Sequence, residues 1–209
     1  GSYTTWYDYD YMNWLFYDST QADRDALKQQ HDDPNQRALL TRILTAKKVV
    51  RDLVDTTEGV RFGFMEFHGA SGGNLTAEVN SDKVPVLNAI DNVWATGSTP
   101  LAETLEDAWL YFKGQFDADG DGTNEPTPIQ QWCQKNFVIL MTDGYPSKDW
   151  NELQYLEGDW DNDHGGGQSE RDLYHGNGSD YLDDIAYYIY KNDLFPATME
   201  GEQIIETYT

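Results

Sequence analysis

The spacing of apolar and polar positions predicts helices and strands in alternation. Apolar residues recur every three or four positions between residues 40 and 53, as on one face of an amphipathic helix. The stretch from Val60 to His68 then predicts a strand, and a glycine-rich turn separates it from a second extended stretch, Asn74 to Val79. Two strands joined by so short a loop should be antiparallel.

The second half of the chain continues this alternation. Helices are expected at about Ser81–Val93, from Thr99-Pro100 onward, and along a stripe that contains Leu182 and Ile189. The run Phe137–Met141 is apolar throughout, which predicts a central parallel strand buried on both faces, and another strand begins near residue 203. Strands separated by helices imply an α/β fold with a largely parallel sheet.

The first 35 residues differ from the rest. Tyrosines alternate with aspartates from Tyr7 to Tyr11, which predicts a short extended stretch with one aromatic face. Such a face either binds a sugar or a surface, or attaches an insertion to the domain. The second interpretation is favoured, because aromatic rings bury large areas wherever they pack. We therefore divide the chain into an aromatic and acidic N-terminal insertion, residues 1–35, and a domain of residues 36–209.

The formal net charge is −23, from 37 acidic and 14 basic residues among 209. Crowded carboxylates repel one another, so the folded chain should be most stable with cations among its acids. Nucleic acid and anionic lipid are excluded as partners because both would be repelled. No apolar run is long enough to cross a bilayer, so no membrane insertion is expected. Calcium is abundant outside cells, which favours an extracellular location.

The strongest local motif is Asp117-Ala-Asp-Gly-Asp-Gly-Thr-Asn-Glu125. Acids at every second position, followed by glycine at the sixth, match the opening half of an EF-hand-type calcium loop. The twelfth position is Pro128, so Glu125 would close the site. The alternative is a solvated acidic turn. The predicted ligands are Asp117, Asp119, Asp121, Thr123 and Glu125.

A second calcium loop is predicted at residues 157–170. Its ligands would be Asp159, Asp161, Asp163 and Glu170. The sixth position holds His164 where glycine is expected, although three glycines follow. The chain would thus hold one or two Ca²⁺ ions in its loops.

No enzymatic activity is expected. Ser71 lies in the glycine-rich turn between two predicted strands and not in the strand-to-helix turn of a nucleophile elbow. Hydrolysis by Asp183 and Asp184 is disfavoured because adjacent residues on a helix do not face a common point. The single cysteine, Cys133, excludes a disulfide within the chain, and we expect a buried thiol.

Two segments resemble the von Willebrand factor A domain. These are Gly97–Leu101 at a helix start and Met141–Gly144 at the end of the apolar strand. Thr99 and Asp143 match two parts of the metal site of that family. Pro100-Leu101, Cys133–Phe137 and Leu182–Tyr188 are more narrowly similar to the PilY group of adhesins and assembly factors at bacterial type IV pilus tips. The resemblance covers residues 37–209.

This resemblance implies a Rossmann-like sheet, mostly parallel with one antiparallel edge strand and with helices on both faces. It also implies an adhesion site, at which Ser2, Thr99 and Asp143 hold Mg²⁺ or Ca²⁺ with one position open to a carboxylate of a partner. The implied function is that of a calcium-binding extracellular module of a type IV pilus-associated adhesin, which binds a protein or surface ligand.

The departures from the family pattern raise an alternative. No D-x-S-x-S loop is present, although Gly1-Ser2 could be its tail, and no apolar strand precedes residue 37. We therefore expect the first, central strand of the family and its last strand to be missing from this chain. A cleaved upstream segment or a neighbouring copy would fill the sheet, unless the sequence is merely a piece of a longer chain. Strand complementation would make the chain a structural subunit of an extracellular filament.

Overall fold

The computed structural model describes residues 20, 37–69, 72–142, 144, 146–147, 153–163 and 179–209. The predicted N-terminal insertion therefore lies outside the described residues, except for Thr20. The chain divides into two compact units. The described part of the first comprises residues 37–58 and 90–95, and the second contains the remaining residues from 59 onward.

The first unit is built on α3, Arg37–Thr56, which confirms the predicted amphipathic helix. The guanidinium of Arg51 lies 2.7 Å from a carboxylate oxygen of Asp91, and Lys47 donates to the carbonyl of Asp91. The ammonium of Lys47 also lies over the ring of Trp94, 4.7 Å from its centroid. Because the Arg51–Asp91 pair is exposed, it contributes about 1 kcal/mol or less to stability.

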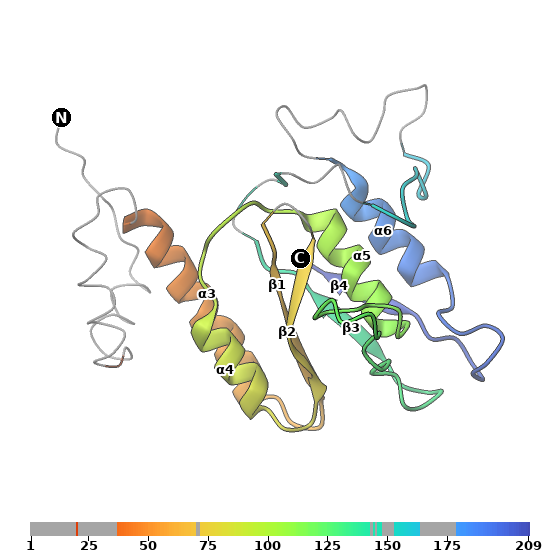
Figure 1. Cartoon of the computed structure of the whole chain (residues 1–209), viewed down its shortest axis with the longest axis horizontal. Helices are drawn as coiled ribbons and strands as arrows, with labels where there is room; N and C mark the ends of the chain where they lie inside the picture. Colours follow the sequence, from red (N-terminus) through yellow and green to blue (C-terminus); the bar gives the residue numbers. More distant parts are fainter. Residues whose placement is uncertain are drawn as a thin grey trace. The chain divides into compact units, whose positions relative to one another are not determined.

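The second unit begins with two antiparallel strands, as predicted (Figure 1). β1 spans Phe62–Phe67 and β2 spans Gly73–Asn80. The turn between them requires glycine at Gly72, whose φ is +85° and where a Cβ atom would lie 2.1 Å from a carboxylate oxygen of Asp107. That same carboxylate accepts the N–H of Gly73 at 2.8 Å, so α5 (Leu101–Phe112), which carries Asp107, holds the start of β2.

Three further helices follow the expected order. They are α4 (Val84–Asn92), α5 (Leu101–Phe112) and α6 (Tyr181–Lys191). In the second unit, α5 and α6 pack against each other, and α6 also packs on β4, Ile205–Tyr208 (Figure 1). Buried apolar side chains from α5 and α6 form the core with Ile205 of β4. The predicted stripe is confirmed at Ile185 and Ile189, both 0% exposed.

β3 (Asn136–Ile139) and β4 (Ile205–Tyr208) form a parallel pair, with Asn136 opposite Ile205. Parallel pairing agrees with the prediction for the apolar run. The prediction that this run is buried on both faces is wrong, because Phe137 is 46% exposed and Ile139 is 58% exposed. Within the described residues β4 alone pairs with β3, and one face of the pair is left without cover.

The four strands do not form one sheet. The described residues contain two two-stranded sheets, one antiparallel and one parallel. The α/β class is therefore confirmed, whereas the expected single, mostly parallel sheet is not observed among these residues.

β1 and β3 nevertheless lie side by side in the same direction. Before the two strands begin, the guanidinium of Arg61 donates to Gln134 Oε1 at 2.7 Å. After they end, Ser98 donates to the carbonyl of Gly69, and the adjacent Thr99 pairs with Ser147. The two strands do not pair directly. They also lie further apart than paired strands at the Arg61–Gln134 contact, because an arginine and a glutamine side chain end to end span more than ~4.8 Å.

Two other sequence expectations concern surface properties. No helix in the described ranges combines the length and the apolar character needed for a bilayer crossing. The thiol of Cys133 is exposed, so the prediction of a buried cysteine is wrong.

We expect Tyr111→Phe to destabilise the second unit. The Tyr111 hydroxyl accepts the N–H of Val79 at 2.9 Å and joins α5 to β2, and burial raises the pKa of Tyr111. Without that acceptor the N–H of Val79 loses its partner, at a cost of about 1–3 kcal/mol. Urea denaturation measures the loss. Tyr155→Phe, at an exposed tyrosine, is the matched control, and equal midpoints for the two variants would contradict the assignment.

Candidate metal centres

The first predicted calcium loop follows α5 and closes on itself. The N–H of Glu125 donates to the carbonyl of Phe116 at 2.8 Å. Gly120 and Gly122, with φ of +73° and +86°, make the two sharp bends that only glycine adopts readily. The glycine at the sixth position of the motif, Gly122, therefore makes a sharp turn.

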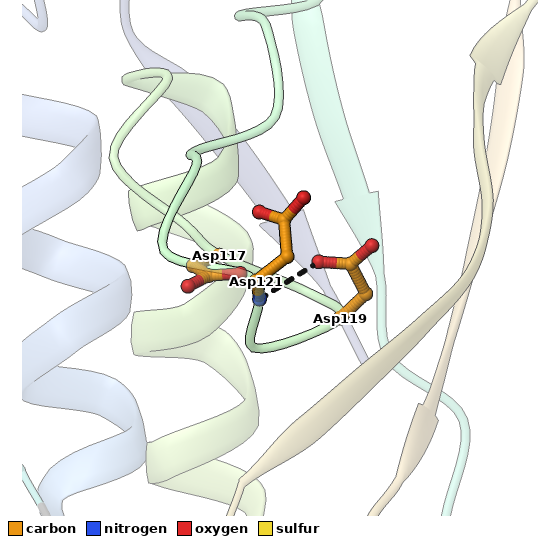
Figure 2. Close-up of side chains that lie close together, drawn as sticks. All are labelled: Asp117, Asp119 and Asp121. Carbon is orange, nitrogen blue, oxygen red and sulfur yellow. Dashed lines mark hydrogen bonds between the residues drawn. The ribbon is translucent and has the colours of Figure 1, made fainter.

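Three of the five predicted ligands come together in this loop. Asp117, Asp119 and Asp121 each offer a carboxylate oxygen within 4.8 Å of the other two (Figure 2). Two unit negative charges about 4 Å apart repel by roughly 1 kcal/mol in water, and more where water is excluded. A cation between these carboxylates would replace this repulsion with attraction.

The backbone fixes the positions of these carboxylates. Asp117 accepts the N–H groups of Gly120 and Gly122, both at 2.8 Å. Asp119 accepts the N–H of Asp121 at 3.1 Å, the contact drawn in Figure 2. Each side chain therefore retains acceptor capacity for a cation while its orientation is already set.

Thr123 and Glu125 have structural contacts in the same loop. The N–H of Thr123 donates to Asp121 at 2.7 Å, and one carboxylate oxygen of Glu125 accepts the N–H of Ala118 at 2.7 Å. Glu125 is not among the three carboxylates that lie together. The roles of Thr123 and Glu125 as metal ligands stay predictions.

A buried acid from α5 holds the segment just before the second predicted loop. Both carboxylate oxygens of Glu106 accept backbone N–H groups, from Gln154, Tyr155 and Leu156 at 2.8–2.9 Å. Glu106 is only 2% exposed. Three N–H donors converging on one carboxylate replace the water that burial removes.

A second buried acid, Asp184 of α6, holds the loop further along. Asp184 Oδ1 accepts the N–H groups of Trp160 and Asp161. This contact brings Asp159, Asp161 and Asp184 within 4.8 Å of one another, and Asp161 and Asp163 likewise meet Asp183. Glu170, the fourth ligand predicted for this loop, lies outside the described residues.

Sequence analysis did not predict that α6 completes this cluster. Asp183 and Asp184 belong to two separate clusters that share Asp161, so the two acids meet the loop without forming one pair. A signal was present, because Asp184 follows Tyr181 by three positions and precedes Ile185 on the buried face of α6. An acid on an apolar helical face requires a polar partner.

The acids of α6 are difficult to ionise. Burial raises the pKa of Asp184 to about 6 from 3.8; the charges of Asp161 and Asp183 add to the shift, and N–H donors from the loop oppose it. Burial, followed by the charge of Asp180, also raises the pKa of Asp183. The positive charge of a divalent cation would outweigh the repulsion from the neighbouring carboxylates and favour the ionised form of both groups.

One of the three residues predicted for the adhesion site is described. Thr99 precedes α5, and its N–H donates to the carbonyl and the hydroxyl of Ser147. It therefore lies at the carboxyl ends of β1 and β3, where open α/β sheets bind their ligands. Ser2 and Asp143 lie outside the described residues.

Comparison with known proteins identifies no family. No protein-family model, no curated protein and no solved structure matches this chain. What the structure supports is therefore limited to its chemistry: acidic clusters in two loops that could hold a metal ion.

The raised pKa of Asp184 predicts how stability depends on pH without divalent ions. Between about pH 4 and pH 6 the folded state keeps a proton that the unfolded chain loses, so the free energy of unfolding falls as pH rises through this window. Asp184→Asn cannot ionise and keeps an acceptor oxygen. We expect it to melt about 2–4 °C higher than the wild type at pH 7.5 in EDTA.

This gain should vanish below pH 4, where Asp184 is protonated in both states. Differential scanning calorimetry across the pH range measures it. If Asp184→Asn is instead less stable than the wild type at pH 7.5, the prediction is wrong. The ionised carboxylate would then gain more from its backbone N–H donors than it loses by repulsion from the neighbouring acids.

Proposed function

We propose that this chain is a calcium-binding extracellular module, similar to the von Willebrand factor A domain of a type IV pilus-associated adhesin, and that it binds a protein or surface ligand without catalysing a reaction. The proposal rests on one observation: three aspartate carboxylates lie within 4.8 Å of one another in the 117–121 loop. The net charge of −23 makes any cation bound there favourable.

Calcium fits the first loop better than magnesium. Ca²⁺ takes six to eight oxygen ligands in flexible geometry, and Mg²⁺ requires a near-ideal octahedron at shorter distances. Alternating aspartates on a loop with two glycine bends supply oxygens from several directions. The cluster of Asp159, Asp161 and Asp184 is the candidate for a second ion.

Ligand recognition is assigned to the carboxyl ends of β1 and β3. The position of Thr99 beside Ser147 supports this assignment. Together with Asp143 and Ser2, Thr99 would hold Mg²⁺ or Ca²⁺ and leave one position open to a partner's carboxylate. Asp143→Ala should then weaken ligand binding with little change in stability, because its role would be that of a ligand to the exposed ion.

Chelation should destabilise the chain. Removing Ca²⁺ leaves the loop carboxylates in mutual repulsion, and an ion present at a hundred times its Kd stabilises by about 2.7 kcal/mol. We expect EDTA to lower Tm by several degrees in a calorimetric scan, and Asp119→Ala to reproduce most of that loss.

Glu202→Ala is the matched control. It removes one exposed carboxylate outside both loops, so its response to EDTA should equal that of the wild type. A wild-type melting curve unchanged by both chelator and added calcium would rule out both loop assignments.

A structural subunit of an extracellular filament is the second candidate. β1 and β3 run side by side without pairing, and β3 exposes Phe137 and Ile139. A strand supplied by a neighbouring copy could enter between them and complete one mostly parallel sheet. Negative-stain imaging of the concentrated chain tests this candidate. Long fibres would favour it, and dispersed particles at high concentration would exclude it.

A further inference from the structure

The outer edge of β4 presents backbone groups that no strand among the described residues pairs with. Leu140 donates to the carbonyl of Tyr208 at 2.8 Å, and the side chain of Asn136 donates to the carbonyl of Ile204 at 3.2 Å. The backbone N–H and C=O groups of the even-numbered residues between 204 and 208 therefore point toward β3. Since successive residues of a strand direct their N–H and C=O groups to opposite edges, those of Thr207 point away from β3.

Among the residues that the structure describes, cover of this edge is seen at its beginning. Leu194 donates to the carbonyl of Gln203, and the N–H of Gln203 donates to Asp193. Beyond Gln203, no second strand pairs with β4 in the described part of the chain. The Thr207 hydroxyl is buried and has no hydrogen-bond partner among the described residues.

A hollow lies along the same edge. It is lined by Glu206, Thr207 and Tyr208 of β4 and by Ala186, Tyr187 and Tyr190 of α6. Consecutive strand residues point to opposite faces, so a hollow that touches three in succession lies at the edge of the strand rather than on one face. A polypeptide added beside β4 would therefore run through this hollow.

The chemistry of the hollow favours a cation. Its three tyrosines are between 43% and 53% exposed, so their rings are accessible. The ammonium of Lys191 already lies 5.6 Å from the ring of Tyr187 and 5.1 Å from that of Tyr190. Glu206 adds a carboxylate, which accepts the Tyr208 hydroxyl at 2.9 Å and raises the pKa of Tyr208.

We propose that the outer edge of β4 binds an extended segment of a basic partner polypeptide. The segment adds a strand beside β4 and places a lysine or arginine side chain among Tyr187, Tyr190 and Tyr208. Charge selects this occupant over a second copy, because two chains that each carry −23 repel one another. The proposal depends neither on the calcium loops nor on filament formation.

Two synthetic peptides of equal charge test the edge. An alternating (Val-Lys)4 peptide can pair as a strand, whereas (Pro-Pro-Lys)4 carries prolines at both odd and even positions and so lacks N–H donors on both edges. In buffer of about 0.15 M ionic strength, which screens general attraction, we expect only (Val-Lys)4 to bind and to shift the NMR amide signal of Thr207. Equal binding of the two peptides, or binding that leaves Thr207 unshifted, would overturn the proposal.

Two variants separate the aromatic contribution from the backbone contribution. Tyr190→Ala should weaken (Val-Lys)4 binding by about tenfold, whereas Tyr155→Ala, at another exposed tyrosine, should leave it unchanged.

Thr207→Pro removes an outward N–H and spares the hydrogen bonds to β3, so it should abolish binding while the fold persists. Unaltered affinity in Thr207→Pro would refute strand addition. Sedimentation that showed a dimer dissociated by Thr207→Pro would assign the edge to a second copy instead.

Discussion

Carboxylates that accept backbone N–H groups determine the shape of the acidic loops. Loop amides have no helix or sheet to pair with, and each must find an acceptor. Here acids supply it: Glu106 binds three successive amides just before the second loop, Asp184 binds two within it, and Asp117 binds two in the first loop. The side chains that crowd negative charge are thus the ones that order the backbone.

This dual role explains why acids persist where they repel one another. Replacing Asp117 would relieve repulsion but free the amides of Gly120 and Gly122, which it now binds. The same holds for Asp184, where burial and neighbouring charges oppose ionisation while two amides favour it. A cation resolves the conflict, because it offsets repulsion without removing the acceptors. The structural argument for metal binding rests on this balance rather than on the number of acids.

Periodicity and turn chemistry predicted most of the elements. The stripe of α3, the glycine-rich turn between β1 and β2, and the parallel pairing of β3 with β4 all follow from local pattern and chain order. The exposure of Phe137 was not predicted, because the apolar character of a strand does not reveal whether a neighbouring element covers it. The contact of Asp184 with the second loop was also missed. Helical spacing identifies the face of a residue but not the distant segment that meets it.

Helix α6 links the acidic cluster to the edge of β4. Asp183, Tyr187 and Tyr190 are exposed and recur at spacings of four and three, so they share one face of the helix. Seven residues span about 10 Å along a helix, which is more than the Debye length of about 8 Å at physiological salt. The charge of Asp183 would therefore attract a basic segment at the tyrosines mainly at low salt, where the Debye length is longer. A divalent ion bound beside Asp183 would weaken that attraction, and thermodynamic linkage requires that the basic segment weaken metal binding by the same factor.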